Sequence, residues 1–349
     1  MKRTLLSWAC LATLLLAGGA QAQTVTVGDI VYDLDTDGRT ATVSGYVGNE
    51  ASVSIPATVE YEGMVCNVVC IGVDAFHFCT TLESVVIPQG VTLIRDNAFY
   101  GCRSLKNVEL PEGMEAFYGS VFGNCTSLAS IDLPESLTGM GYNTFDGCTS
   151  LRSITVPDGV TEIGSSTFYG CTALEEVALP ERLASIGGDA FHDCTSLRAI
   201  TLPAGLQMAG MWAFVNCPLA DVHCLASVPP IAFSETFDAA AYATATLHVP
   251  AGTAGAYQEA DGWKEFQNIA DDAVSGISAV GASDGVLARY ADGVVTAPDL
   301  ADITVYGPDG ARALHVSSAT SLSLEGLPDG IYVISVTKGR QRQVLKVVR

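Results

Sequence analysis

A period of 23 residues runs through the middle of this sequence. Phenylalanine recurs at this interval from Phe76 to Phe214, and cysteine recurs at the same interval from Cys79 to Cys217. Leucine, two further apolar positions and a proline follow at fixed offsets in each unit. One unit of this length cannot bury its apolar side chains alone, so consecutive units must stack and share a core. The period therefore predicts a repeat solenoid.

The spacing of apolar residues changes halfway along each unit, which has the pattern F-x-x-C-x-x-L-x-x-V-x-I-P. The spacing of three predicts a helical or 3₁₀ turn, and the later alternation predicts a short half-buried strand that the proline ends. Polar residues two positions before each Phe are expected to cap the turn. They are Asp74, Asn97, Ser120, Asn143, Ser166 and Asp189.

The first 70 residues predict a leader followed by a cap. Residues 1–22 have the basic start, apolar stretch and small terminal residues of a signal peptide, so the chain is expected to be exported and to begin at Gln23. Residues 23–70 predict an N-terminal cap with a hairpin from Ile30 to Tyr46, because solenoid ends need covering.

The repeat array is expected to span residues 71–224, and a C-terminal cap is expected at 225–272. Trp263 and Phe266 are the candidates to cover the last coil. A linker at 273–276 and a small all-β sandwich at 277–349 follow, because the period ends and short alternating segments replace it.

The charge balance limits the classes of partner. The 349-residue chain has 17 basic and 38 acidic residues, for a net charge of −21. The negative electrostatic field of such a chain opposes binding to nucleic acid and to anionic membrane surfaces, so no nucleic-acid partner is expected. No segment reaches the roughly 20 apolar residues of a membrane span, so none is expected.

The repeat also resembles a known family, the BspA-like leucine-rich-repeat surface proteins. The resemblance extends over residues 23–272 and about seven units. It implies a leucine-rich-repeat solenoid at the cell surface that adheres to host or neighbouring-cell proteins. One unit that shows it contains Ile186, Gly187, Ala190, Phe191, Cys194, Leu197, Ile200, Leu202 and Pro203.

A second resemblance covers residues 303–349. The segments Ile303–Tyr306, Leu327–Val336 and Lys346–Arg349 resemble a type IX secretion C-terminal sorting domain. This resemblance implies secretion machinery as a partner, passage across an outer membrane, removal of the domain and surface attachment. Similar small sandwiches without such a role are the alternative.

The cysteine column permits two interpretations. Stacked strands lie about 4.8 Å apart, a separation that allows disulfides in an exported protein. The column has an odd number of members on the inward face, which favours buried thiols that pack as small apolar groups. Cys66, Cys70, Cys217 and Cys224, near the caps, are the candidates for disulfides.

No catalytic site, metal site or cofactor is expected. His77 and His192 are five coils apart, roughly 24 Å at strand spacing, so they cannot act together. The D-x-D-x-D-G segment from Asp33 to Gly38 opens like a calcium loop but lacks the closing glutamate, which favours a hairpin turn. A row of acidic residues at Glu112, Glu135, Asp158 and Glu181 permits either a solvated turn or cation binding.

The outward strand positions form the candidate binding face. Solenoids use such continuous surfaces for ligands, although an exposed polar face also needs no ligand. The residues are Glu109, Asp132, Arg152, Thr155, Arg198 and Thr201. The sequence thus predicts a protein-binding or adhesion solenoid for an extracellular protein or glycan, and the alternative is a structural or carbohydrate-associated envelope component.

Overall fold

The computed structural model of the chain describes residues 23–37, 39–271, 289–291, 294–306, 312–328, 331–338 and 341–348. The predicted signal peptide and linker lie outside the described residues. The chain divides into two compact units, one ending at Ala270 and the other beginning at Asp271.

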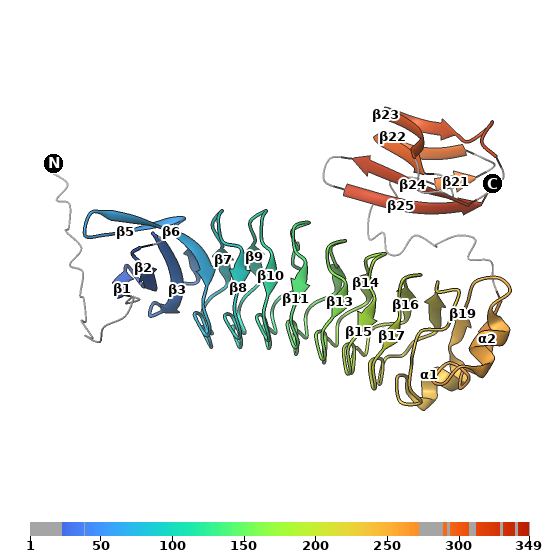
Figure 1. Cartoon of the computed structure of the whole chain (residues 1–349), viewed down its shortest axis with the longest axis horizontal. Coiled ribbons are helices and arrows are strands. Elements are labelled where there is room, and N and C mark those ends of the chain that lie inside the picture. Colours follow the sequence, from blue (N-terminus) through green and yellow to red (C-terminus); the bar gives the residue numbers. More distant parts are fainter. Residues whose placement is uncertain are drawn as a thin grey trace. The chain divides into compact units, whose positions relative to one another are not determined.

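The first unit begins with an antiparallel cap (Figure 1). β1 (Gln23–Val27) pairs with β2 (Ile30–Asp35), which pairs with β3 (Thr40–Tyr46). β2 and β3 thus form a hairpin over the segment from Ile30 to Tyr46. β5 (Thr58–Tyr61) and β6 (Met64–Ile71) form a second hairpin, and β6 runs parallel to β3. This parallel contact joins the cap to the coils that follow.

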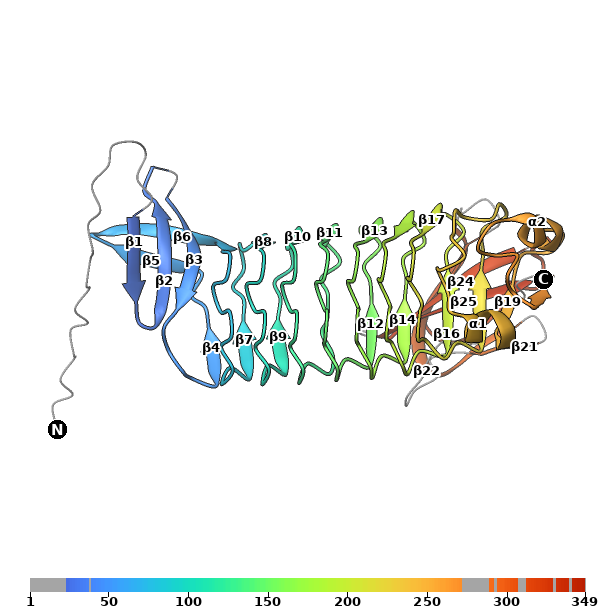
Figure 2. The same cartoon turned by 90° about the horizontal axis from the view of Figure 1, so that it is seen from below.

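The predicted proline-ended strands form the first row of parallel strands in the array (Figure 2). Strand residues of neighbouring coils pair at equivalent positions, as Val85 pairs with Val108. The coil around Asp132 has no assigned strand. The row contains β4 (Ser52–Ser54), β7 (Ser84–Val86), β9 (Asn107–Glu109), β12 (Ser153–Thr155), β14 (Glu176–Ala178), β16 (Ala199–Leu202), β18 (Asp221–Cys224), β19 (Thr246–His248) and β20 (Asn268–Ala270).

A second row of short parallel strands, which the periodicity did not predict, lies along another side of the coils (Figure 2). Each strand has two residues, one buried and one facing outward, so no alternating run marks it in the sequence. The row contains β8 (Leu93–Ile94), β10 (Ala116–Phe117), β11 (Gly139–Met140), β13 (Glu162–Ile163), β15 (Ser185–Ile186) and β17 (Met208–Ala209).

The predicted helical or 3₁₀ turn in each coil is wrong. Backbone N–H groups there alternate in direction: that of Phe99 donates to Val121 of the next coil, and that of Cys102 donates to Phe99 of its own coil. Consecutive helical bonds cannot form, so each coil makes turns instead. The predicted caps, including Asp74 and Asn97, have φ between +54° and +57°. Asn and Asp tolerate this left-handed conformation better than most residues.

A stack of phenylalanine rings forms the centre of the core. Neighbouring rings from Phe76 to Phe237 lie 5.0–5.6 Å apart and nearly parallel. Tyr46 of the N-terminal cap begins the stack, at 5.2 Å from Phe76. At the other end Trp263 and Phe266 are buried, and the Phe266 ring meets Phe237 edge-on at 5.0 Å. The caps thus continue the same aromatic column.

Two short helices complete the C-terminal cap. Asp238 caps the N-terminus of α1 (Ala239–Thr244), because its carboxylate accepts a hydrogen bond from the backbone N–H of Ala241. α2 (Ala254–Glu259) buries Tyr257. The Tyr257 hydroxyl donates to the carbonyl of Ala226 at 2.7 Å, which fixes the helix to the last coils.

The described strands of the second unit form one antiparallel sheet. β22 (Val294–Tyr306) pairs antiparallel with β21 (Arg289–Ala291), β23 (Arg312–Ser323) and β24 (Ile331–Lys338), and β24 pairs with β25 (Gln341–Val348). β22 joins two segments that the sequence pattern separates. The unit has its own core, made of Val295, Ala297, Ala301, Ile303, Val305, Leu324, Ile334 and Val336.

No helix among the described residues has the length and apolar composition needed to cross a membrane.

Four glycines mark the places where neighbouring coils approach most closely. Gly141, Gly164, Gly187 and Gly210 occupy the same position in consecutive coils. A Cβ at any of them would lie 2.5–3.0 Å from backbone atoms of the preceding coil. Real Cβ atoms do not approach backbone so closely, so a side chain there would push two coils apart.

We predict that Gly187→Ala destabilises the chain by about 1–3 kcal/mol, the usual cost of overpacking. The new Cβ would lie 2.6 Å from the backbone nitrogen of Ser165. Urea unfolding followed by circular dichroism measures the change. Gly255→Ala in α2 is the control, because its Cβ would meet no atom within 4 Å. Equal stabilities of the two variants would contradict the close packing of coils.

Candidate binding surface

The six candidate residues lie on the exposed side of the first strand row, which we call the strand face. Glu109, Thr155 and Thr201 lie on β9, β12 and β16, and Arg152 and Arg198 precede the latter two strands. All are exposed except Thr201, which is half-buried. Glu109 and Thr201 are four coils apart, about 19 Å at strand spacing. The residues therefore share one extended surface and do not converge on a single site.

The strand face is polar and regular. Lys106 and Glu83, on adjacent coils, form an ion pair of 2.9 Å. Ahead of the strands, threonine hydroxyls that directly follow the Cys of each turn donate to carbonyls of the preceding coil at 3.3–3.5 Å, as Thr195 does to Thr172. Toward the C-terminal end the rings of His223 and His248 stack at 4.4 Å. Repetition of the coil thus turns single polar residues into continuous columns.

The exposed aromatic residues of the first unit lie away from the strand face. We call this region the turn face; it comprises the exposed side of the Phe–Cys turns, the second strand row and the loops that continue both in the C-terminal cap. Sequence periodicity did not single out these residues, because other coils have glycine or small polar residues at several of the same positions. Departure from the repeat consensus is the signal that could have found them. The exposed aromatic residues are Phe78, Tyr118, Tyr142, Tyr169, Trp212 and Phe233.

The N-terminal part of the turn face carries an aromatic cluster. His77 contacts the rings of Phe78 and Tyr100 at centroid distances of 4.3 and 5.5 Å. The Asn124 side chain donates to the Tyr100 hydroxyl at 3.1 Å. The Tyr100 ring is therefore held by its neighbours on both sides.

The C-terminal end of the turn face carries a group of exposed apolar side chains, which we call the apolar patch. The exposed fractions are 37% for Met208, 38% for Met211, 46% for Trp212, 62% for Ile231 and 38% for Phe233. Exposed apolar groups gathered on one surface are typical of interaction sites.

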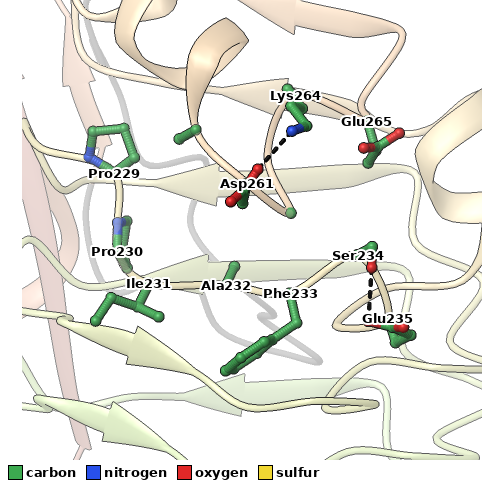
Figure 3. A pocket seen from close by; sticks show the side chains of 12 residues that line it. Pro229, Pro230, Ile231, Ala232, Phe233, Ser234, Glu235, Asp261, Lys264 and Glu265 are labelled. Atoms are coloured by element: carbon green, nitrogen blue, oxygen red, sulfur yellow. Dashed lines mark hydrogen bonds and ion pairs between the residues drawn. The ribbon is translucent and has the colours of Figure 1, made fainter.

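An open pocket adjoins the apolar patch. It lies between the segment from Pro229 to Glu235 and the turn that holds Asp261, Lys264 and Glu265 (Figure 3). Lys264 and Asp261 form an ion pair, which raises the pKa of the lysine and lowers that of the carboxyl. Two further carboxylates, Glu235 and Glu265, line the pocket, so its charged groups have a net negative charge.

The repeat matches a family model. The model described as the BspA type leucine-rich repeat region matches in six copies, over residues 58–175 and 120–239, which together are just over half of the chain. The chain belongs to the BspA-type leucine-rich-repeat family. BspA-like proteins are typically cell-surface proteins, and leucine-rich-repeat proteins are generally non-enzymatic scaffolds that typically bind proteins.

Solved structures of other bacterial leucine-rich-repeat proteins are similar to this BspA-type chain. A leucine-rich cell surface protein from Faecalibacterium prausnitzii is 28% identical with a TM-score of 0.55, and the match covers 65% of this chain and 70% of the other. A leucine-rich-repeat protein of T. pallidum is 30% identical with a TM-score of 0.49, and the match covers 55% of this chain and 88% of the other. A leucine-rich-repeat protein from Bacteroides ovatus is 27% identical with a TM-score of 0.49, and the match covers 66% of this chain and 62% of the other. No curated protein matches the chain.

The cysteines of the BspA-type repeats are free thiols, all buried except the half-buried Cys79. The ten cysteines among the described residues are free, including the four near the caps that were candidates for disulfides. The six thiols from Cys102 to Cys217 each donate to the carbonyl of the Phe one coil back, at 3.0–3.2 Å. Burial raises the pKa of Cys102 to about 12 and holds those of Cys125 and Cys171 well above the usual range. A thiol held neutral in this way is a poor nucleophile.

The histidines and acidic residues singled out in the sequence occupy structural positions. His192 contacts Asp189 through Nδ1 at 2.9 Å, and its ring lies tilted against that of Tyr169 at 5.1 Å, whereas the thiol of nearby Cys194 points inward to Phe168. Asp33 lies in β2 and accepts from the hydroxyl of Thr24 at 2.6 Å. The acidic row from Glu112 to Glu181 is exposed. Among the described residues no group of three or more His, Cys, Asp or Glu is placed to hold a metal ion.

We predict that the free energy of unfolding falls as the pH rises above about 9. A thiol in the unfolded chain ionises near pH 8.5–9, whereas the raised folded pKa keeps the buried thiol protonated. The unfolded state then binds fewer protons, so each such thiol lowers stability by about 1.4 kcal/mol per pH unit until its folded pKa is reached.

Urea unfolding between pH 8 and 10.5 measures this slope. Cys148→Ala removes one buried thiol and should reduce the slope by about 1.4 kcal/mol per pH unit, whatever its effect at neutral pH. Cys79→Ala, at a half-buried position, is the comparison and should change the slope less. A slope that Cys148→Ala leaves unchanged would contradict the buried, protonated column.

Proposed function

We propose that this chain is an exported, surface-displayed adhesion protein that binds extracellular proteins of a host or neighbouring cell. The observation that carries the proposal is the exposed surface that the nine strands of the first row, with the strandless coil of Asp132 among them, present on one uninterrupted core. Solenoids of this kind bind partners across many coils at once. The family and its typical surface location support the same function.

The strand face is the proposed contact for polar partners. Its exposed residues Glu109, Asp132 and Thr155 are on successive coils, and Arg152 and Arg198 supply positive charges on a chain of net charge −21. A partner that pairs with these arginines would be oriented along the coil axis. Electrostatic complementarity of this kind chiefly sets specificity and the rate of association.

We predict that Arg152→Glu with Arg198→Glu weakens binding to an extracellular protein at least tenfold, about 1.4 kcal/mol, because both charges are reversed. Surface plasmon resonance of the full chain against a panel of extracellular-matrix proteins and glycans measures this. Arg39→Glu with Arg182→Glu makes the same change in net charge away from the strand face and should have little effect.

Full binding by the Arg152/Arg198 variant would exclude the strand face as the contact. Binding to glycans alone, with no protein of the panel bound, would favour the alternative function of a carbohydrate-associated envelope component.

We also propose that the second unit is a type IX secretion sorting domain. Its independent core and separate antiparallel sheet suit a module that is removed after export. The segments that carry the resemblance lie on β22 (Ile303–Tyr306), β24 (Ile331–Val336) and β25 (Lys346–Val348). Removal of this unit would leave the repeat unit intact, because the two cores are separate.

We predict that the surface form begins at Gln23 and lacks the second unit. Mass spectrometry of the protein released from the cell surface identifies both ends in one measurement. A surface form that retains Arg349 would contradict a cleaved sorting domain.

A further inference from the structure

We propose that the apolar patch on the turn face docks a segment of a partner protein in which a lysine or arginine lies beside large apolar side chains. The inference rests on the proposed function of protein binding and assigns it a second surface, distinct from the strand face. The apolar side chains of the segment cover Trp212 and Phe233, and its cation enters the adjoining pocket.

The five residues of the apolar patch lie on two neighbouring coils. Met208 pairs with Ile231 in a parallel bridge, and the backbone N–H of Trp212 donates to Glu235 of the next coil at 2.9 Å. The same register places Phe233 opposite Gly210, which has no side chain to cover the ring. Tryptophan, phenylalanine and methionine are enriched at protein interfaces, where large buried side chains supply much of the binding energy.

The backbone beneath the patch is held in place by the core. The indole N–H of Trp263 donates to the carbonyl of Pro230 at 2.7 Å, and the Tyr242 hydroxyl donates to that of Phe233 at 3.2 Å. Trp263 and Tyr242 are themselves buried. The exposed side chains therefore project from a fixed backbone, which reduces the entropy lost when a partner binds.

The pocket beside the patch selects a positive charge. Lys264 is already paired with Asp261, which leaves the carboxylates of Glu235 and Glu265 without a cationic partner of their own in the pocket lining. The hydroxyl of Ser234 donates to Glu235 at 2.7 Å and orients that carboxylate (Figure 3). A lysine or arginine of the partner pairs with a carboxylate of this lining, and the net charge of −21 favours its approach.

The composition of the patch favours a protein segment over a sugar. Three of its five side chains, Met208, Met211 and Ile231, are aliphatic or thioether groups, which gain by leaving water but offer no flat ring for a sugar to stack on. The end of the second strand row is closed, since a Cβ on Gly262 would lie 2.8 Å from the peptide between Ala232 and Phe233. The partner segment therefore packs on the side chains of the apolar patch and does not add a strand to the second strand row.

The test is selection of peptides from a library of random dodecapeptides displayed on phage, with the full chain immobilised. We expect the enriched peptides to combine Arg or Lys with large apolar residues. Their affinity, measured by fluorescence anisotropy, should fall at least tenfold in Trp212→Ala and severalfold in Glu235→Gln with Glu265→Gln. Tyr142→Ala, an exposed aromatic outside the patch, should bind as the unaltered chain does.

Three results would overturn the docking site. Peptides that bind Trp212→Ala with unchanged affinity would place protein binding elsewhere and leave the proposed function standing. Enriched peptides without basic residues would refute the role of the pocket. Glycan-array binding or self-association by light scattering that Trp212→Ala abolishes would assign the patch to a sugar or to a second copy of the chain. The patch side chains are exposed, so equal melting temperatures should verify that the variants fold.

Discussion

The backbone of each coil forms hydrogen bonds with the coils on both sides, and every other feature of the first unit depends on this constraint. Because the N–H of Phe99 reaches the next coil and that of Cys102 turns back, the segment between them cannot become a helix. The same spacing sets the Phe76–Phe237 rings 5.0–5.6 Å apart. It also leaves no room for a Cβ at Gly141, Gly164, Gly187 and Gly210. Tyr46 and Phe266 end the column with aromatic rings of the caps.

Regular stacking produces two exposed sides with different chemistry. On the strand face, polar side chains repeat from coil to coil, and Lys106 and Glu83 form an ion pair between adjacent coils. On the turn face, departures from the repeat place large exposed apolar groups, such as Trp212 and Phe233. The regular side suits broad polar contact, whereas the irregular side supplies local anchors. A partner that uses both sides would gain affinity from one and orientation from the other.

The sequence was sufficient to predict the array because Phe, Cys and Leu columns reflect burial directly, and each buried side chain recurs in register. It missed the second strand row because two-residue strands such as Leu93–Ile94 show no alternation. It assigned a helical turn because a spacing of three also arises when i→i+3 turns alternate with inter-coil bonds. Glu109 and Arg198 are exposed, and their role in binding stays a prediction. The sequence pattern did not predict the apolar patch because the Cys and Leu columns end before residue 231, which left the segment of Ile231 and Phe233 outside the predicted array.

Hydrogen–deuterium exchange of the full chain, with and without a selected peptide, tests most directly the claim that binding occurs on a preformed surface of the stacked coils. Added protection confined to residues 208–212 and 229–235, with slow exchange across the Phe76–Phe237 coils in both states, is the predicted result. Protection along the strand face alone would contradict the assignment of the apolar patch. Rapid exchange throughout the coils before binding would contradict the rigid, hydrogen-bonded stack.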